Sequence, residues 1–139
     1  MKYITVEQFK EQPLEVQKVF LDWWKCDYGD LYYYNEYPLE YKDFEVINSD
    51  LESDIEGDFD YFKSIGAIPI FTEGQLREFI EDKVESKILT INFWGGYSFK
   101  FINDKTISAL RNDLLQAYWK VACEIAKEEC KRWKVQQKE

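Results

Sequence analysis

Six carboxylates occupy every second position of the stretch DLESDIEGDFD, at Asp50, Glu52, Asp54, Glu56, Asp58 and Asp60. Carboxylates this close together can bind a cation, share protons in acid–base chemistry, or present negative charge to a partner. They can also form only the solvent-exposed face of a strand whose other face packs through Leu51, Ile55, Phe59 and Tyr61. In an extended strand, alternate side chains share one face at a separation of about 6.6–6.8 Å. That separation is close to the one between successive phosphates of an extended nucleic-acid backbone, so the pattern can imitate a nucleic acid.

Calcium binding is the first alternative. In an EF-hand loop, Glu52, Asp54 and Glu56 would take positions 1, 3 and 5, and Gly57 would take the turn position. Position 12, which requires a bidentate carboxylate, is Lys63. The sequence therefore leaves at most a weak, adventitious Ca²⁺ site, and we predict no metal site.

The cysteines do not supply another metal site. The chain has three, Cys26, Cys123 and Cys130, and no histidine. A zinc site needs about four nitrogen or sulfur ligands, so these thiols are more typical of small apolar core residues. An odd cysteine count without framework spacing also indicates a reducing compartment, and we expect a cytoplasmic protein.

Catalytic motifs are missing from the sequence. It contains no Gly-rich phosphate loop, nucleophile elbow or HExxH motif. With 27 acidic residues, pairs of carboxylates arise by chance, and no residue marks one pair as special. We therefore predict a non-enzymatic protein without a cofactor.

The negative charge is concentrated in one segment. From Asp27 to Asp60 there are twelve acidic residues and one lysine, a net charge of −11, whereas the other residues together carry +2. Such a segment would repel phosphate and attract a basic protein surface. Five tyrosines of the segment could anchor that contact, Tyr32, Tyr33, Tyr34, Tyr37 and Tyr41.

Two helices are predicted from their start signals. Thr5 with Gln8, and Thr72 with Gln75, fit the capping box in which each side chain accepts a hydrogen bond from a free backbone N–H of the first turn. Pro13 lacks an N–H and suits a first helical position, so the residues after it form either a second helix or a kinked continuation of the first.

A hairpin is predicted at the pair Gly95–Gly96, which can form a type I′ turn and place Trp94 opposite Tyr97. One face of the hairpin would then hold Asn92, Trp94, Tyr97, Phe99 and Phe101. On this face Trp94, Tyr97 and Phe99 would form an aromatic pocket for a small molecule, which is the alternative to a binding site in the acidic segment.

A long helix is predicted from about Thr106 to near the C-terminus, with Ile107 and Leu110 opening its apolar stripe. Roughly 28 residues at 1.5 Å each give about 42 Å, more than a domain of this size needs. Its end could therefore pair with another chain and form a homo-oligomer.

Several stretches resemble a known group of proteins. FTEGQLREFIED, the hairpin and DLLQAYWKVACEIAKEE are similar to small phage and prophage proteins of clostridia and bacilli, including the group described as the phage ABA-sandwich domain. The resemblance covers about residues 70 to 130 and involves structural motifs. It implies origin in a mobile element and offers no catalytic residues.

These observations predict one α+β domain over residues 1–139, with N-terminal helices, a small antiparallel sheet and a long closing helix. The function expected first is inhibition of a host protein that binds nucleic acid or acts in defence. This chain would bind a basic surface of that host protein. The chain would not bind nucleic acid directly, and no apolar run is long enough to span a membrane. Alternatives are a protein that sequesters a small molecule or nucleotide signal, and an oligomeric structural accessory protein.

Overall fold

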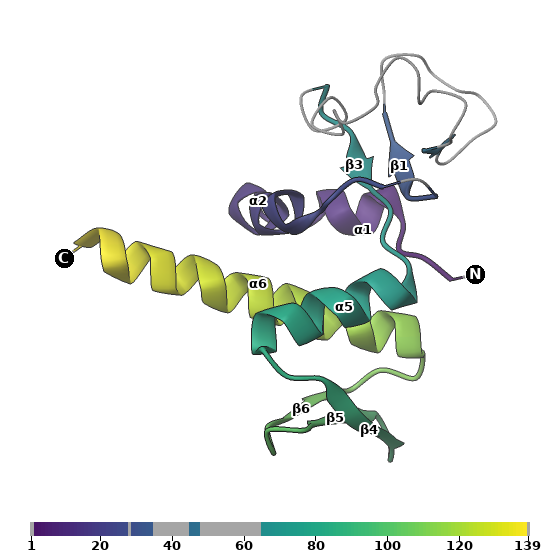
Figure 1. Ribbon diagram of the computed structural model, residues 1–139, viewed down its shortest axis with the longest axis vertical. Helices are drawn as coiled ribbons and strands as arrows, with labels where there is room; N and C mark the ends of the chain where they lie inside the picture. The colour runs from purple at the N-terminus through teal and green to yellow at the C-terminus, as the bar shows by residue number, and fades with distance from the viewer. Residues whose placement is uncertain (1, 28, 35–44, 48–64, 139) are drawn as a thin grey trace. The chain divides into compact units, whose positions relative to one another are not determined.

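The computed structural model describes residues 2–27, 29–34, 45–47 and 65–138. Its helices and short antiparallel strands, closed by one long helix, confirm the α+β class (Figure 1). The chain forms two compact units, Thr5–Phe71 and Met1–Ile4 with Thr72–Glu139, called here the N-terminal and C-terminal units. The single domain expected from length stays a prediction.

Two helices open the N-terminal unit. In α1 (Val6–Lys10) the Thr5 hydroxyl accepts from the Gln8 N–H and the Gln8 side chain accepts from the Thr5 N–H, which confirms the predicted capping box. α2 (Leu14–Trp23) begins one residue after Pro13, so the proline precedes the helix instead of opening it.

A three-stranded antiparallel sheet completes this unit. β1 (Leu31–Tyr33) lies between β2 (Glu45–Val46) and β3 (Ile68–Pro69). The core beside it is aromatic: the ring centroids of Phe20 and Phe71 are 5.8 Å apart, and those of Phe9 and Phe20 are 6.3 Å apart.

In the C-terminal unit, two helices lie on one side of a second antiparallel sheet (Figure 1). The helices are α5 (Glu73–Val84) and α6 (Leu114–Lys138), and the sheet has the order β4 (Ile88–Phe93), β5 (Tyr97–Phe101), β6 (Thr106–Ala109). The predicted capping box of Thr72 and Gln75 is confirmed at the start of α5. Phe99 of β5 stacks on Tyr118 of α6, with ring centroids 5.1 Å apart, so the core lies between sheet and helices.

The predicted start of the last helix is wrong. Residues from Thr106 to Ala109 form β6, in which Ile107 pairs with Phe99, and α6 begins only at Leu114. Thr-Ile-Ser-Ala alternates polar and apolar residues, which is the period of a strand, and pairing with β5 decides between the two periods. Asp113 then accepts a hydrogen bond from the Gln116 N–H at the helix start.

The predicted register of the hairpin is also wrong. Phe93 pairs with Tyr97, so the turn contains three residues and only its middle one, Gly95, has a positive φ of 69°. A slip of one residue moves side chains to the opposite face. Asn92 and Trp94 therefore do not share the inner face.

Candidate interaction surface

The predicted acidic site lies outside the described residues. This holds for all six alternating carboxylates and for two of the five tyrosines, namely Asp50, Glu52, Asp54, Glu56, Asp58, Asp60, Tyr37 and Tyr41. The same is true of Lys63, on which the rejection of an EF-hand rests. What the structure describes is how the chain is held on either side of this stretch.

The strands that flank the acidic stretch in sequence are held by opposite edges of β1. Leu31 pairs with Val46 of β2 on one edge, and Tyr33 pairs with Ile68 of β3 on the other. Ile47 continues the attachment: its N–H donates to the Asp30 carbonyl at 2.9 Å. Buried apolar side chains support both attachments, among them Leu31, Ile47, Ala67 and Ile70.

One carboxylate of the acidic segment has a structural role. Asp30 Oδ2 accepts hydrogen bonds from the indole Nε1 of Trp24 at 3.0 Å and from the Asp27 N–H at 3.1 Å. Trp24 itself is almost fully buried. Asp30 therefore closes the turn before β1 and accepts the hydrogen bond of the buried Trp24 indole. This structural role makes it an unsuitable residue for a partner contact.

The described tyrosines divide between core and surface. Tyr32 is buried, with 7% of its surface exposed, so it packs within the unit and does not anchor a partner. Tyr33 is half-buried, and Lys10 Nζ lies 4.9 Å from its ring centroid, a cation–π arrangement. Tyr34 is also half-buried, so the anchoring role stays a prediction for these two residues.

The structure separates Trp94 from the other two residues of the alternative aromatic pocket. Trp94 is 95% exposed in the turn, whereas Phe99 is fully buried beneath the helices. Tyr97 lies between Phe93, at a centroid distance of 5.0 Å, and Phe99, at 6.4 Å. Phe99 is thus a core residue that no ligand touches in this arrangement, and Trp94 is not brought to it.

The sequence did not reveal that the hairpin tip is apolar and exposed. Phe93 is 54% exposed, Trp94 95% and Leu110 75%. Gly96 fixes the tip against β6, because a Cβ atom at this position would lie 3.0 Å from the Ala109 carbonyl oxygen and 3.2 Å from Leu110 Cα. Only knowledge of the β5–β6 pairing would have shown that Leu110 belongs with the hairpin turn.

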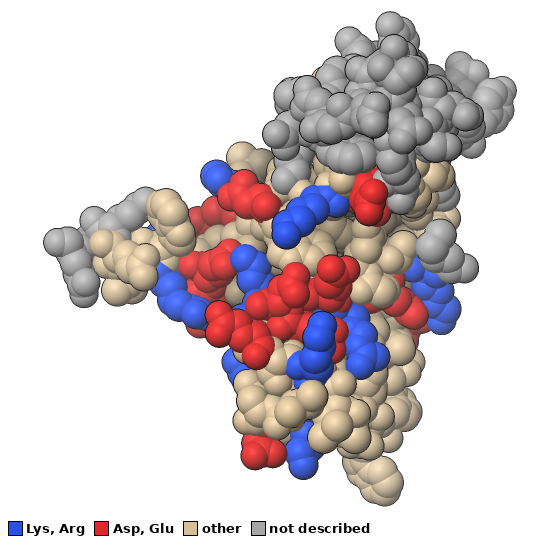
Figure 2. All heavy atoms as spheres, viewed as in Figure 1, with Lys and Arg blue, Asp and Glu red and all other residues tan. Residues whose placement is uncertain are grey.

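Charged side chains are intermixed on the C-terminal unit. On the face drawn in Figure 2, acidic side chains gather over α5, with lysine and arginine among them. Arg77 and Glu81 link this helix to the sheet, since the guanidinium of Arg77 donates to the Ile88 carbonyl at 3.1 Å and Glu81 accepts from the Ile88 N–H at 2.7 Å.

Burial shifts the pKa of two groups in this unit. Desolvation raises the pKa of Tyr118, and the neighbouring Arg77 only partly offsets this effect. Desolvation likewise raises the pKa of the Cys123 thiol to about 12. Both groups therefore stay neutral near pH 7, and Cys123 behaves as the small apolar core residue that its sequence context indicated.

Within the described residues, no three acidic or cysteine side chains gather in a way that could hold a metal ion. None of the helices in this part of the chain combines the length and apolarity needed to cross a bilayer. Comparison of the chain with protein-family models, curated proteins and solved structures gives no match. The resemblance to phage proteins therefore stays a prediction.

Proposed function

We propose that this chain is a non-catalytic protein of a phage or other mobile element that binds a basic protein surface through its acidic segment. By imitating the charge of a nucleic acid, it would inhibit a host nucleic-acid-binding or defence protein. The observation that carries the proposal is the segregation of charge, −11 from Asp27 to Asp60 against +2 over the rest of the chain. Like charges on one strand face repel one another, so folding alone does not favour such a pattern.

The attachments of the segment support a role in binding. β2 and β3 are held on β1 by backbone pairing and by buried apolar side chains such as Ile47 and Ile70. Backbone pairing and apolar burial thus account for how the strands on either side of the alternating carboxylates are held. We infer that the carboxylates themselves serve recognition.

Recognition of this kind acts first on the rate of association. A segment of charge −11 attracts a basic surface over about one Debye length, roughly 8 Å at physiological ionic strength. Association should therefore be fast at low salt and slow down steeply as salt is added. Tyr33 and Tyr34, both half-buried, would add short-range aromatic contacts to the complex.

The test compares two variants with equal net charge. In the first, the six alternating carboxylates become amides, at Asp50, Glu52, Asp54, Glu56, Asp58 and Asp60. In the second, six acidic residues elsewhere become amides, at Glu7, Glu11, Glu15, Glu78, Glu124 and Glu128, all of which are exposed. Each variant and the wild type are used to capture proteins from a bacterial lysate, and the captured protein is then purified for kinetic measurement.

We expect the first variant to keep its fold and to lose most of its affinity, with a much weaker salt dependence. The second should bind almost as the wild type does. The proposal is wrong if the first variant retains wild-type affinity for the purified partner. Equal loss in both variants would show that only total charge matters, which also contradicts a localised binding face.

A further inference from the structure

Strand β4 lies at an edge of the C-terminal sheet and is covered at one end only. The sheet has the order β4-β5-β6, so among the described residues β4 pairs with β5 alone (Figure 1). At the first residue of β4, Ile88, side chains of α5 bond both backbone groups, and a bulge follows before Thr90. A covering helix and a bulge both keep an edge strand from pairing with another chain. From Thr90 to Phe93, in contrast, the pairing with β5 is regular.

Two residues of this regular part direct their backbone groups out of the sheet. On β5, the Phe101 N–H donates at 2.9 Å to a carbonyl just before β6, so it points away from β4. Backbone groups of successive residues alternate between the two edges of a strand, so those of Phe99 and Tyr97 also point away from β4. Their partners on β4 are Ile91 and Phe93. These two residues therefore present their N–H and C=O groups at the free edge.

The β4 edge is uncharged and partly apolar. Residues 88–99 include no charged residue and no proline, which are the residues that often protect an edge strand. Leu89 is 60% and Phe93 54% exposed. At the opposite edge, in contrast, the exposed side chains of β6 are the polar ones of Thr106 and Ser108. Covering the edge of β4 would therefore remove apolar surface from water, and covering that of β6 would not.

A second copy of β4 complements this edge. If the two strands run antiparallel about a two-fold axis at Asn92, Ile91 of each copy lies opposite Phe93 of the other. Both residues present their backbone groups at the edge, so each such pair can exchange two hydrogen bonds. Asn92, which is exposed, then lies opposite itself in a pair with Cα atoms about 4.5 Å apart, and the two amides can bond each other. A two-fold interface must match itself, and this strand does.

Charge favours a second copy as the occupant. The whole chain carries −9, but the unit that contains β4 has 13 basic and 11 acidic residues over residues 1–4 and 72–139, a net charge of +2. Two such units repel each other little. A strand with charged side chains would lose their hydration against the apolar residues of β4, whereas β4 itself brings no charge to the contact.

We propose that the protein forms a two-fold symmetric dimer in which the β4 strands of two copies pair and join their sheets into one. The pairing is centred on Asn92, with Ile91 and Phe93 on the helix-covered face and Asn92 on the other face. It ends at Thr90, where the bulge and α5 begin to protect the edge. The dimer does not involve the acidic segment and does not depend on the function proposed for it.

The test uses the residue that should lie opposite itself. Sedimentation velocity of the full-length chain is measured at concentrations up to about 1 mM, which detects even a weak dimer. The variants are Asn92→Lys, Asn92→Glu and an equimolar mixture of the two. Matched controls are Thr106→Lys and Thr106→Glu, which place the same charges at an exposed position on the same face of the sheet, in β6.

We expect the wild type and both controls to dimerise as concentration rises. Each Asn92 variant alone should dimerise at least tenfold more weakly, because like charges directly opposite each other are destabilising. The mixture should restore dimerisation, because Lys then lies opposite Glu. A wild type that stays monomeric overturns the proposal. Dimerisation of either variant as strong as that of the wild type also overturns it, because the interface would then lie elsewhere.

A second measurement covers the case in which a charge at position 92 unfolds the chain, which circular dichroism would reveal. Two Cys residues in a close pair of antiparallel strands lie within reach of a disulfide. Under mild oxidation, Asn92→Cys should therefore form a covalent dimer much faster than the control Thr106→Cys. Equal rates of cross-linking in the two variants overturn the proposal.

Discussion

Arg77 Nε lies 3.5 Å from Glu81 Oε2, one turn further along α5. The side chains of these two residues form hydrogen bonds with the backbone of Ile88: Arg77 donates to its carbonyl, and Glu81 accepts from its N–H. Ile88 is almost fully buried at the start of β4. The strand has a register irregularity directly after it, between Ile88 and Thr90. The side chains of α5 therefore supply hydrogen bonds where the ladder with β5 is interrupted, and they fix the sheet to the helix.

Replacing Glu81 by alanine should destabilise the C-terminal unit by about 1–3 kcal/mol, because the buried Ile88 N–H would lose its acceptor. Chemical denaturation of the variant and the wild type measures this difference. Glu78→Ala, at an exposed position on the same helix, is the matched control and should change stability by less than about 0.5 kcal/mol. Equal effects of the two changes would show that the Glu81 contact contributes nothing specific.

The glycines of the hairpin turn should tolerate substitution poorly, each for a different reason. In Gly96→Ala the new Cβ would lie 3.0 Å from the Ala109 carbonyl oxygen, so the turn must move away from β6. In Gly95→Ala the residue would be strained at a φ of 69°, which we expect to cost about 1 kcal/mol. Gly74→Ala in α5 is the control, since a Cβ there meets only Thr72 Oγ1 at 3.9 Å and alanine favours a helix. If the melting temperatures of all three variants agree, the turn is not constrained as described.

The sequence predicted those elements whose signals are local. Both capping boxes depend on residues three positions apart, so Thr5 with Gln8 and Thr72 with Gln75 could be recognised without knowing the fold. The start of α6 could not, because the alternation from Thr106 to Ala109 is short and only pairing with β5 makes it a strand.

The same limit applies to the hairpin and its aromatic residues. The turn has three residues, and Gly96 in it lies close to Ala109 and Leu110, a proximity of two segments that no local pattern encodes. Exposure of Trp94 and burial of Phe99 follow from that register and from the position of Tyr118. For the acidic segment, the sequence shows composition and spacing, and its function remains a proposal.

Cys123 should resist modification in the folded protein. Burial raises its pKa to about 12, so almost no thiolate forms at pH 8. After treatment with iodoacetamide, peptide mapping should show Cys130, which is half-buried, modified well before Cys123. Rapid alkylation of Cys123 would mean that this part of α6 opens readily.

The raised pKa of Cys123 also predicts how stability depends on pH. In the unfolded chain the thiol has its ordinary pKa of 9.0, so between pH 9 and about 12 the folded state binds more protons than the unfolded state. The contribution of this group is fully present below pH 9 and is lost as pH rises towards 12. Cys123→Ala should lose this part of the slope, with denaturation at a series of pH values as the measurement, whereas the part due to Tyr118, whose pKa burial also raises, should be the same in both proteins.

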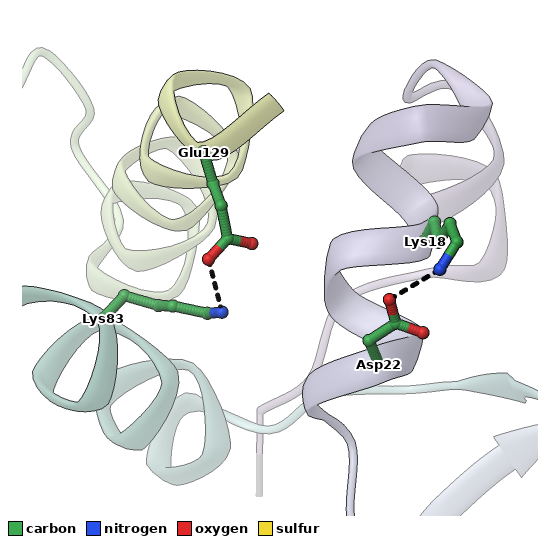
Figure 3. Close-up of polar contacts among 4 residues, drawn as sticks. All are labelled: Lys18, Asp22, Lys83 and Glu129. Atoms are coloured by element: carbon green, nitrogen blue, oxygen red, sulfur yellow. Dashed lines mark hydrogen bonds and ion pairs between the residues drawn. The ribbon is translucent and has the colours of Figure 1, made fainter. Parts of the chain in front are cut away.

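Two ion pairs of equal length should differ in strength. Lys83–Glu129 and Lys18–Asp22 are both 2.8 Å long (Figure 3), but the side chains of the first are 25% and 37% exposed and those of the second 73% and 66%. The second pair also joins residues of one helix turn, whereas the first joins α5 to α6. Solvent screens the more exposed pair more strongly, so we expect couplings of about 0.3–0.5 kcal/mol for Lys18–Asp22 and up to about 1 kcal/mol for Lys83–Glu129.

Double-mutant cycles with alanine at both positions of each pair measure these couplings. Because Lys83 lies where α5 ends, loss of its pair should also loosen the end of α5, and amide exchange should become faster around Val84 than around Gly74. Added salt should reduce the Lys18–Asp22 coupling proportionally more than the other. A coupling at Lys83–Glu129 no larger than that of the exposed pair would show that this contact does not hold the two helices together, and the end of α5 would then be fixed by its apolar contacts alone.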